Sequence, residues 1–343
     1  MAVLITGGAG YIGSHMALAL RDAGEACVVL DDLSTGERAA VPDGVPLVVG
    51  DVGDAALVLR VLAEHEIDTV AHFAARISAP ESVRDPLGYF AANTGKTRDL
   101  LAAVVAAKVG RFIFSSTAAV YGLNPPTPTA ETAACAPGSP YGVSKLMSEW
   151  IVRETSAAHD LACVTLRYFN VAGADPKGRN GQRAAGASNL ITVATRAALG
   201  LNPGLSIFGA NLPTPDGTGV RDYIHVSDLA DAHVAALAYL RGGGKTVTLN
   251  CGYGWGYSVK EVVAAVRRAA GDFPVREAAA RPGDPYVSIA DASLIRETLG
   301  WRPRHADLDQ IVGDALRWEK SLWRPGRKTA GAARPAAMRR RAS

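Results

Sequence analysis

Tyr141 and Lys145 have the residue types and the spacing that a proton-transfer site requires. They stand four residues apart in the segment Tyr-Gly-Val-Ser-Lys. Four residues make about one helical turn, so a helix would place the phenol and the ammonium group on one face. A free tyrosine has a pKa of about 10, and a neighbouring ammonium group lowers it by favouring the phenolate. The pair therefore predicts acid–base catalysis at neutral pH. The alternative is a pair on a helix surface.

Hydroxyl groups stand shortly before this pair. Residues 111–114 predict a buried strand, and Ser115, Ser116 and Thr117 follow it directly. The carboxyl ends of strands in an open parallel sheet face the crevice in which such sheets bind ligands. We therefore expect these hydroxyls to face the active crevice, and a loop with several prolines, residues 124–140, to cover it.

The elements that must position these residues begin at the amino terminus. Residues 3–5 predict a buried parallel strand, and a helical apolar pattern follows after Gly7, Gly10 and Gly13. Glycine allows a sharp turn and a close approach of the backbone to a phosphate. The helix amino terminus adds free N–H groups and a partial positive charge. This order predicts a dinucleotide site, although a glycine pattern alone is a weak signal.

A second predicted strand, residues 27–30, strengthens that interpretation because it ends in Asp31 and Asp32. A carboxylate at this place accepts hydrogen bonds from the ribose hydroxyls of a dinucleotide. It would repel an additional 2′-phosphate, so the sequence favours NAD over NADP. A bound nicotinamide cation would also favour the phenolate of Tyr141.

The alternation of strands and helices predicts the fold class α/β, with a Rossmann-type doubly wound parallel sheet and a smaller α/β substrate-binding lobe. Further strands are expected at 47–50, 69–73 and 162–169, and a long helix at 86–108. Beyond residue 172 the alternation becomes irregular. We expect an NAD-binding domain over 1–172, a substrate-binding lobe over 173–323 and a basic, disordered tail over 324–343.

Four polar side chains in the first domain have competing interpretations. Asp51 either accepts from the adenine amino group or caps a helix, and Asp54 is expected to cap the helix that follows it. His72 lies inside an apolar strand and is interpreted as a structural histidine. Asn93 falls within the predicted helix 86–108, where such a residue usually faces solvent or bonds locally.

The second lobe is expected to contain helices at 189–199, 227–240 and 258–270 and strands at 205–208 and 246–251. Arg221 and Arg281 are the natural clamps for a diphosphate there, since a guanidinium fork matches phosphate oxygens. Each of them alone would be interpreted as a surface arginine.

Composition excludes several classes of protein. The chain of 343 residues is 48% apolar and 20% charged, and no apolar run is long enough to span a bilayer. No signal peptide precedes the first strand, so we expect a cytoplasmic protein. The net charge of +3 includes seven Lys or Arg in 324–343, which leaves −4 for the rest. Such a basic tail could contact nucleic acid or a membrane surface, but the preferred interpretation is a solvated tail, with neither nucleic acid nor a membrane as partner. The cysteines form no CxxC pair, so neither a metal site nor a disulfide is expected. They are Cys27, Cys135, Cys163 and Cys251.

With these residues identified, the chain resembles the UDP-glucose 4-epimerases of the extended short-chain dehydrogenase/reductase family from residue 1 to about residue 323. The resemblance rests on GGAGYIGSH from Gly7, SSTAAVYG from Ser115, SPYGVSK from Ser139, RYFNVAGA from Arg167, DGTGVRDYIHVSDLA from Asp216 and RPGD from Arg281. The run from Asp216 is much more specific than any dinucleotide signature. The family is commonly dimeric, which implies a homodimer.

The resemblance implies three groups of site residues and no metal. Catalysis at the sugar 4-hydroxyl is implied for Tyr141, Thr117 and Lys145. Contact with NAD is implied for Gly7, Gly10, Tyr11, Ile12, Gly13, Asp31, Asp32, Leu33, Ser34, Thr35, Gly36, Asp51, Val52, Phe73, Ala74, Ala75, Asn93, Ser115, Lys145 and Tyr168. Contact with the UDP-sugar is implied for Ser116, Thr117, Tyr141, Phe169, Asn170, Asn189, Leu190, Ser206, Ile207, Phe208, Arg221, Arg281, Asp284 and Ser288.

The implied reaction interconverts UDP-galactose and UDP-glucose. Tyr141 takes the proton of the 4-hydroxyl while NAD takes the hydride from C4, and the transient 4-keto sugar turns over in the pocket. The hydride then returns to the opposite face, so that NAD is regenerated in each turnover. The UDP group must be held while the sugar swings, which accounts for diphosphate contacts spread over the second lobe.

The chain departs from the family pattern at two positions. Thr117 stands where many members have serine, which preserves the hydroxyl. Ile77 stands where many members have a lysine that contacts the cofactor, with Arg76 adjacent. A third position concerns the sugar: Ser288 replaces a bulky tyrosine found in members restricted to plain hexoses. A small residue there implies acceptance of N-acetylated sugars, unless Tyr286 fills the space.

Three other functions remain open. A sugar-nucleotide 4,6-dehydratase needs a further acid and base, where this chain has Ala118 and Ala119. A 4-epimerase of another UDP-sugar, such as UDP-GlcNAc/UDP-GalNAc, a UDP-pentose or a UDP-hexuronate, would keep every motif. A cofactor-sensing regulator would have no need of Tyr141 and Lys145 together.

Overall fold

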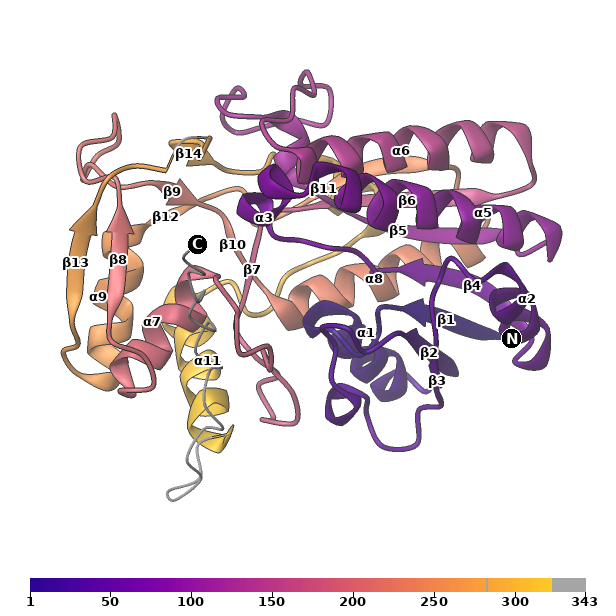
Figure 1. Ribbon diagram of the computed structural model, residues 1–343, viewed down its shortest axis with the longest axis horizontal. Coiled ribbons are helices and arrows are strands. Elements are labelled where there is room, and N and C mark those ends of the chain that lie inside the picture. The colour runs from indigo at the N-terminus through magenta and orange to yellow at the C-terminus, as the bar shows by residue number, and fades with distance from the viewer. Residues whose placement is uncertain (282, 323–343) are drawn as a thin grey trace, which may run out of the picture.

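A seven-stranded, entirely parallel sheet forms the centre of the computed structural model, which describes residues 1–281 and 283–322 (Figure 1). Its strand order, β11-β6-β5-β4-β1-β2-β3, is that of a doubly wound sheet, so the predicted fold class is confirmed. The strands of this sheet are β1 (Ala2–Thr6), β2 (Cys27–Asp31), β3 (Leu47–Val49), β4 (Ile67–His72), β5 (Arg111–Thr117), β6 (Ala162–Tyr168) and β11 (Val247–Cys251). The predicted tail, 324–343, lies outside the described residues.

Helices cover both faces of this sheet because its strands are apolar on both sides. On one face Ile5 packs with Met16 and Leu229, in a core that α1 (Tyr11–Asp22) and α8 (Val226–Arg241) cover. On the other face Leu4 packs with Val104 and Val152. The helices of that second face are α2 (Ala55–Glu64), α5 (Lys96–Ala106) and α6 (Pro140–Ala158). Figure 1 shows these two helical layers on either side of the strands.

Three small sheets and three helices build a second lobe beside the carboxyl ends of the central strands (Figure 1). The sheets pair β7 (Asn170–Ala172) with β10 (Tyr223–His225), β8 (Leu205–Phe208) with β13 (Val275–Ala278), and β9 (Val220–Arg221) with both β12 (Tyr257–Ser258) and β14 (Val287–Ser288). The helices are α7 (Leu190–Ala198), α9 (Val259–Ala270) and α11 (Leu308–Leu322), and α10 (Ser293–Leu299) packs against β11 and α8.

The chain crosses between the two lobes more than once. Both α8 and β11 fall within the segment 173–323 that was expected to form the second lobe, yet β11 pairs with β6 and α8 packs on α1. A single boundary at residue 172 does not describe this return. This return could not be predicted from the sequence, because a buried apolar strand has the same residue pattern in either lobe.

The predicted helix over 86–108 is interrupted where Asn93 lies. It begins as α4 (Pro86–Tyr89), continues as one turn of π-helix, η2 (Phe90–Gly95), and resumes as α5. In the π-turn the carbonyl oxygen of Asn93 accepts from Thr97 Oγ1 at 2.5 Å and from Ser148 Oγ at 3.2 Å. Inserted hydroxyls of this kind disturb the regular helical ladder, and such turns are frequent at functional sites. The remaining short helices are α3 (Ala79–Arg84), η1 (Arg38–Ala40) and η3 (Ala118–Tyr121).

Within the described residues, no helix combines the length and the apolar character that a membrane crossing demands. All four cysteines lie there as free thiols, and three of them, Cys27, Cys163 and Cys251, are buried.

Candidate active site

The glycine turn between β1 and α1 has no side chain that would keep a bound phosphate away from its backbone. Gly7 has a φ of +69°, and a Cβ there would lie 2.5 Å from the backbone nitrogen of Ala74. A Cβ on Gly13 would lie 2.5 Å from the carbonyl oxygen of Gly7. Gly10 begins α1 without any side-chain cap, so the N–H groups of the first turn have no side-chain acceptor. This turn suits a pyrophosphate group.

Asp31 stands beside this turn at the end of β2 and is 6% exposed. Its carboxylate accepts from the backbone nitrogens of Ala9 at 2.9 Å and Leu33 at 2.8 Å. Burial raises the pKa of Asp31, and these two hydrogen bonds oppose that rise. Asp32 instead is exposed and accepts from the backbone nitrogen and hydroxyl of Ser34. Asp31 is therefore the better placed of the two to accept from a ribose, and with the uncapped helix it fits a bound NAD.

Tyr141, Thr117 and Lys145 come together at the carboxyl end of β5. Ser139 caps α6 by accepting from the backbone nitrogen of Gly142 at 3.3 Å, which places Tyr141 in the first turn. The Thr117 hydroxyl lies beside the Tyr141 phenol and acts to lower its pKa. Lys145 lies one turn further on, is 3% exposed and has its Nζ 4.7 Å from the centre of the Phe114 ring. The predicted proton-transfer pair thus shares one helical face.

The pKa values of this pair differ from the expectation. Burial raises the pKa of Tyr141 to about 12, against a lowering by the Thr117 hydroxyl. Burial also lowers the pKa of Lys145 to about 7, against a raising by Glu149. The sequence-based expectation rested on nearby positive charge alone. Burial also removes hydration, and this loss disfavours both the Tyr141 phenolate and the Lys145 ammonium group. A positive charge added beside the phenol, such as a nicotinamide ring, would favour the phenolate.

The hydroxyls at the end of β5 point to opposite sides, as side chains of a strand alternate. Ser115 lies on the side of the Tyr168 phenol, which contacts the Nε2 atom of His233. Ser116 is 2% exposed and donates from its Oγ to Glu149. The structure therefore gives Ser116 a buried protein partner on the α6 side, and the expected contact with substrate is not supported there.

Asn93 uses its amide inside the protein. Its Oδ1 accepts from the backbone nitrogen of Arg76 at 2.8 Å, and its Nδ2 donates to the Arg76 carbonyl at 2.9 Å and to Ser144 Oγ at 3.0 Å. Ser144 lies between Tyr141 and Lys145, and its hydroxyl donates to the Tyr141 carbonyl at 2.7 Å. Asn93 thereby joins the loop after β4 to α6, the catalytic helix that carries Tyr141 and Lys145.

Arg76 does not replace the lysine that many relatives carry at position 77. Its guanidinium pairs with Glu81 at 2.6 Å and Asp85 at 2.7 Å and lies 4.5 Å from the centre of the Tyr89 ring. Ile77 is 73% exposed. No side chain at these two positions is left to make the missing cofactor contact.

Three polar residues of the first domain can now be interpreted. The Asp51 carboxylate accepts from Lys96 Nζ at 2.6 Å and from the backbone nitrogen of Gly53 at 2.8 Å, and it caps no helix. Asp54 caps α2 as predicted, accepting from Leu57 N at 3.1 Å. His72 is a structural histidine, since its ring nitrogens bond the hydroxyls of Thr6 at 2.7 Å and Thr97 at 2.9 Å.

Arg221 and Arg281 lie on the second lobe, and neither forms an ion pair with a residue that the structure describes. The Arg221 guanidinium donates to the carbonyl oxygens of Val220 at 2.9 Å and Tyr286 at 3.3 Å, and burial lowers its pKa. Arg281 lies 3.7 Å from the centre of the Phe208 ring. A buried guanidinium that meets only carbonyl oxygens is a ready partner for a phosphate.

Asn189 adds an unsatisfied polar atom to this region. It begins α7 without capping it, and its buried Oδ1 has no hydrogen-bond partner among the described residues. Buried polar atoms are rarely left unpaired, so this oxygen fits a donor on a bound molecule. Leu190 follows as the first residue of the same helix.

Other expected substrate residues are placed less favourably. The Ile207 side chain is 5% exposed and belongs to the apolar core, so only its backbone is available. Ser206 Oγ accepts from Arg276 Nε at 3.0 Å. Phe169 is 8% exposed, whereas Asn170 and Asp284 are exposed.

The remaining cofactor residues line the carboxyl edge of β3 and β4. Val52 is buried, and the Phe73 ring packs on His233 at a centroid distance of 4.8 Å. Ala74 and Ala75 follow directly, with Ala74 against Gly7. Tyr11, at the start of α1, donates from its hydroxyl to the Gly173 carbonyl at 2.7 Å. The glycine turn is thereby tied to the chain that leads into the second lobe.

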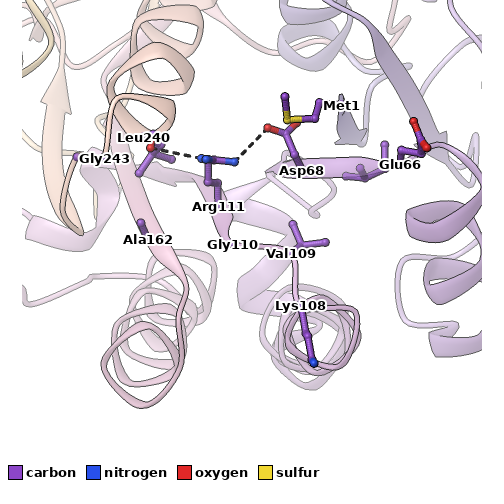
Figure 2. Close-up of a pocket in the computed structure, with 12 residues that line it drawn as sticks. Met1, Glu66, Asp68, Lys108, Val109, Gly110, Arg111, Ala162, Leu240 and Gly243 are labelled. Carbon is purple, nitrogen blue, oxygen red and sulfur yellow. Dashed lines mark hydrogen bonds and ion pairs between the residues drawn. The ribbon is translucent and has the colours of Figure 1, made fainter.

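Two open pockets lie away from Tyr141. The larger, about 650 Å³, is at the amino-terminal ends of the central strands, where Arg111 donates to Asp68 at 3.1 Å and to the Leu240 carbonyl at 3.3 Å (Figure 2). Arg111 and Asp68, two of its charged side chains, are thus already paired with each other. The smaller, about 420 Å³, is lined by residues 209–212 and 277–280, directly after Phe208 and before Arg281.

Three residues that surround the site, Tyr89, Ser144 and Glu149, were not predicted from the sequence. Tyr89 is fully buried and lies edge-on to Tyr141 at a centroid distance of 6.5 Å. Only Glu149 could have been found from spacing, because it continues the interval of four from Tyr141 through Lys145.

Comparison with known proteins agrees with this site. Residues 3–252 match the NAD dependent epimerase/dehydratase family. A UDP-glucose 4-epimerase from Azospirillum brasilense is 55% identical over 93% of this chain and 92% of the relative. The crystal structure of the Stenotrophomonas maltophila UDP-glucose 4-epimerase, with NAD and formylated UDP-arabinopyranose, has a TM-score of 0.91 at 41% identity, covering 94% of this chain and 98% of its own. The UDP-Glc/GlcNAc 4-epimerase of Campylobacter jejuni has a TM-score of 0.81 at 44% identity, covering 93% and 99%. The glycine turn, Asp31 and the Tyr141–Lys145 face are therefore those of a member of the NAD dependent epimerase/dehydratase family, to which this chain belongs.

Proposed function

We propose that this protein is a UDP-glucose 4-epimerase that interconverts UDP-galactose and UDP-glucose with bound NAD. The observation that carries the proposal is the placement of Tyr141 beside Thr117, one turn from the buried Lys145, at the sheet edge that also bears the glycine turn. The high identity to named UDP-glucose 4-epimerases over nearly the whole chain supports the same reaction.

Each catalytic side chain has one task in this proposal. The phenolic oxygen of Tyr141 takes the proton from the sugar 4-hydroxyl and later returns it, while the Thr117 hydroxyl holds that oxygen in place. The Lys145 ammonium lies on the same helical face and stabilises the phenolate. Bound NAD supplies the hydride acceptor and donor at C4, so no net oxidation occurs.

The UDP group is held by the second lobe while the sugar turns. We assign Arg221 and Arg281 to the diphosphate, Asn189 Oδ1 to a donor of the nucleotide, and the Phe208 ring to the region of the base. We keep the division into an NAD-binding part and a UDP-sugar-binding lobe, with 226–251 assigned to the NAD-binding part because α8 and β11 complete its sheet and helical layer.

A second candidate, 4-epimerisation of UDP-GlcNAc and UDP-GalNAc by the same enzyme, is favoured by Ser288. This small side chain is the register partner of Arg221 across β14 and β9, on the lobe that would hold the diphosphate. The Campylobacter jejuni relative is named for both glucose and N-acetylglucosamine substrates. A 4,6-dehydratase is disfavoured, since Ala118 and Ala119 offer no acid or base beside Thr117.

We also propose a homodimer in the cytoplasm. Large apolar side chains on α3, α4 and α6 are exposed in the single chain: Val83 at 65%, Leu87 at 78% and Trp150 at 50%. Apolar patches of this kind commonly mark protein interfaces. Four free cysteines suit a reducing compartment. Light scattering of the purified protein measures the assembly, and a monomeric mass would contradict the dimer.

The test of the reaction is incubation of purified protein with UDP-galactose and no added NAD. We expect UDP-glucose to form, and nucleotide released from the denatured protein to be NAD. Addition of UDP-GalNAc, a UDP-pentose and a UDP-hexuronate in parallel assays identifies the sugar. Formation of a 4-keto-6-deoxy product would point to the dehydratase, and no conversion of any UDP-sugar would contradict the proposal.

A further inference from the structure

Glu149 lies on α6 one helical turn beyond Lys145. Tyr141, Lys145 and Glu149 follow at intervals of four, so their side chains stand one above another on the same helical face. The proposed function uses the first two and assigns nothing to Glu149. Glu149 is only 7% exposed, which is unusual for a glutamate. A buried carboxylate requires partners that compensate for its lost hydration.

Those partners come from the ends of two neighbouring central strands. Arg167 on β6 donates from Nη2 to Glu149 Oε2 at 2.6 Å and from Nε to Oε1 at 3.0 Å, and Ser116 on β5 donates to the same carboxylate. Ser116 and Arg167 are register partners in the parallel pair. The carboxylate therefore fastens α6 to the strands that carry Thr117 and Tyr168 at their next positions.

Lys145 has no other anionic neighbour that the structure describes. The groups facing it are the Phe114 ring on β5, the neutral His72 on β4 and Tyr141 on its own helix, and it forms no ion pair. Glu149 is the one group whose charge favours the Lys145 ammonium against its burial. The two side chains make no direct contact within ion-pair distance, so the charge acts through a dry interior, where it is weakly screened.

We propose that Glu149 is a positioning residue of the catalytic helix, which supplies the negative charge that keeps Lys145 an ammonium group and fixes Tyr141 relative to Thr117. The proposal rests on the proposed function for its relevance to turnover. Arg167 weakens the electrostatic effect of Glu149 on Lys145, because its guanidinium neutralises part of the charge of the same carboxylate. Tyr121 contacts Arg167 at 2.9 Å, and Cys135 and Glu131 complete the titratable surroundings of the pair.

Loss of Glu149 and loss of Arg167 change the charge near Lys145 in opposite directions, although either substitution breaks the same Glu149–Arg167 ion pair. Glu149→Gln removes the anion, so the ammonium is less favoured and the phenolate of Tyr141 forms at higher pH. Arg167→Gln leaves the anion uncompensated, so the ammonium is more favoured and the phenolate forms at the same or lower pH. A role confined to stability would move both variants alike, because each leaves one buried charge unpaired.

The experiment is a pH titration of phenolate absorbance in the NAD-loaded protein, with Tyr141→Phe subtracted, together with the pH profile of kcat. For Glu149→Gln we expect the phenolate midpoint and the acid limb of kcat to rise by on the order of one pH unit, with KM for UDP-galactose within about twofold. Should that variant fold poorly, Glu149→Gln/Arg167→Gln leaves no buried charge unpaired and should show a rise in the same direction, smaller because the Arg167 charge is lost as well.

Equal shifts of the phenolate midpoint in Glu149→Gln and Arg167→Gln would overturn the proposal, as would an unchanged midpoint in Glu149→Gln or in the double variant. The absorbance titration does not depend on which sugar is turned over. A shifted midpoint in a protein that converts no UDP-sugar would therefore contradict the proposed function and leave the role of Glu149 standing.

Discussion

Ser288 lies opposite Arg221, as register partners of the parallel strands β14 and β9. Neighbouring side chains in such a pair project from the same face of the sheet, so Ser288 stands on the face that bears the proposed diphosphate clamp. A serine in place of an aromatic ring leaves room for an acetamido group as the keto sugar rotates.

We therefore expect the wild-type protein to interconvert UDP-GlcNAc and UDP-GalNAc as well as UDP-galactose and UDP-glucose. Ser288→Tyr should abolish conversion of the N-acetylated pair and leave UDP-galactose turnover within about threefold, as a space-filling change acts on the larger substrate. Ser288→Ala is the matched control, which should keep both activities. A wild-type protein that converts UDP-galactose but not UDP-GalNAc would show that another side chain, such as the half-exposed Tyr286, fills the space.

Tyr141→Phe removes the phenolic oxygen that lies beside Thr117 and leaves the ring against Tyr89. Loss of a general acid–base group costs about 10²- to 10⁴-fold in kcat, so epimerisation should fall at least that far while NAD stays bound. Rates come from conversion of UDP-galactose, and cofactor content from absorbance of the denatured protein. Turnover at the wild-type rate would remove Tyr141 from the mechanism.

Cofactor choice should follow Asp31. Its carboxylate is 6% exposed and lies between the backbone nitrogens of Ala9 and Leu33, so an added 2′-phosphate would meet a poorly hydrated negative charge. Apo-protein reconstituted with NAD should recover activity at least about tenfold better than with NADP. Asp31→Asn should narrow the difference, whereas Asp32→Asn, at an exposed site, should not. Equal recovery with both cofactors would show that Asp31 does not discriminate.

Arg221→Lys tests the diphosphate clamp. Lysine keeps the charge but loses the forked geometry, and a hydrogen bond to a charged group contributes about 1.5–3 kcal/mol. We expect KM for UDP-galactose to rise about tenfold or more, with a smaller change in kcat. The control is Arg276→Lys, whose guanidinium bonds Ser206 on a neighbouring strand. An unchanged KM in the Arg221 variant would place the diphosphate elsewhere.

His72 should make stability depend on pH. Burial lowers its pKa to about 3, below the ordinary value of 6.5, so the unfolded chain binds the proton more readily over that interval. The folded state is therefore favoured above pH 6.5 and loses this contribution as the pH falls toward 3. Between pH 7.5 and 5 the loss from this one group is about 2 kcal/mol.

Urea unfolding at the two pH values measures this effect. His72→Gln should reduce the acid loss by about 2 kcal/mol relative to wild type, although it lowers stability at both pH values. His159→Gln, at an exposed position after α6, should leave the acid loss unchanged. An identical acid loss in wild type and His72→Gln would contradict the assignment.

The sequence predicted those features that depend on local pattern. The apolar strands, the glycine turn, the Asp54 cap and the structural His72 follow from spacing and neighbouring residues, and the structure confirms them. The face on which Tyr141 and Lys145 meet follows in the same way from the helical repeat.

The features that escaped prediction depend on distant partners. The π-turn at Asn93 is held by Ser148, which approaches only once α6 packs on α5. The buried contact of Ser116 requires Glu149, and the direction of the Tyr141 pKa shift depends on burial, which no single segment reveals.

The pairing of β6 with β11 ties the order of folding to the order of synthesis. During translation β6 leaves the ribosome well before its neighbour, and the first part of the second lobe, from β7 to β10, lies between them in the chain. Until β11 arrives, the backbone groups of β6 form an open edge that can pair with another chain. A fragment that stops at residue 172 should therefore aggregate, because the edge of β6 is covered only when the chain has been made as far as Cys251.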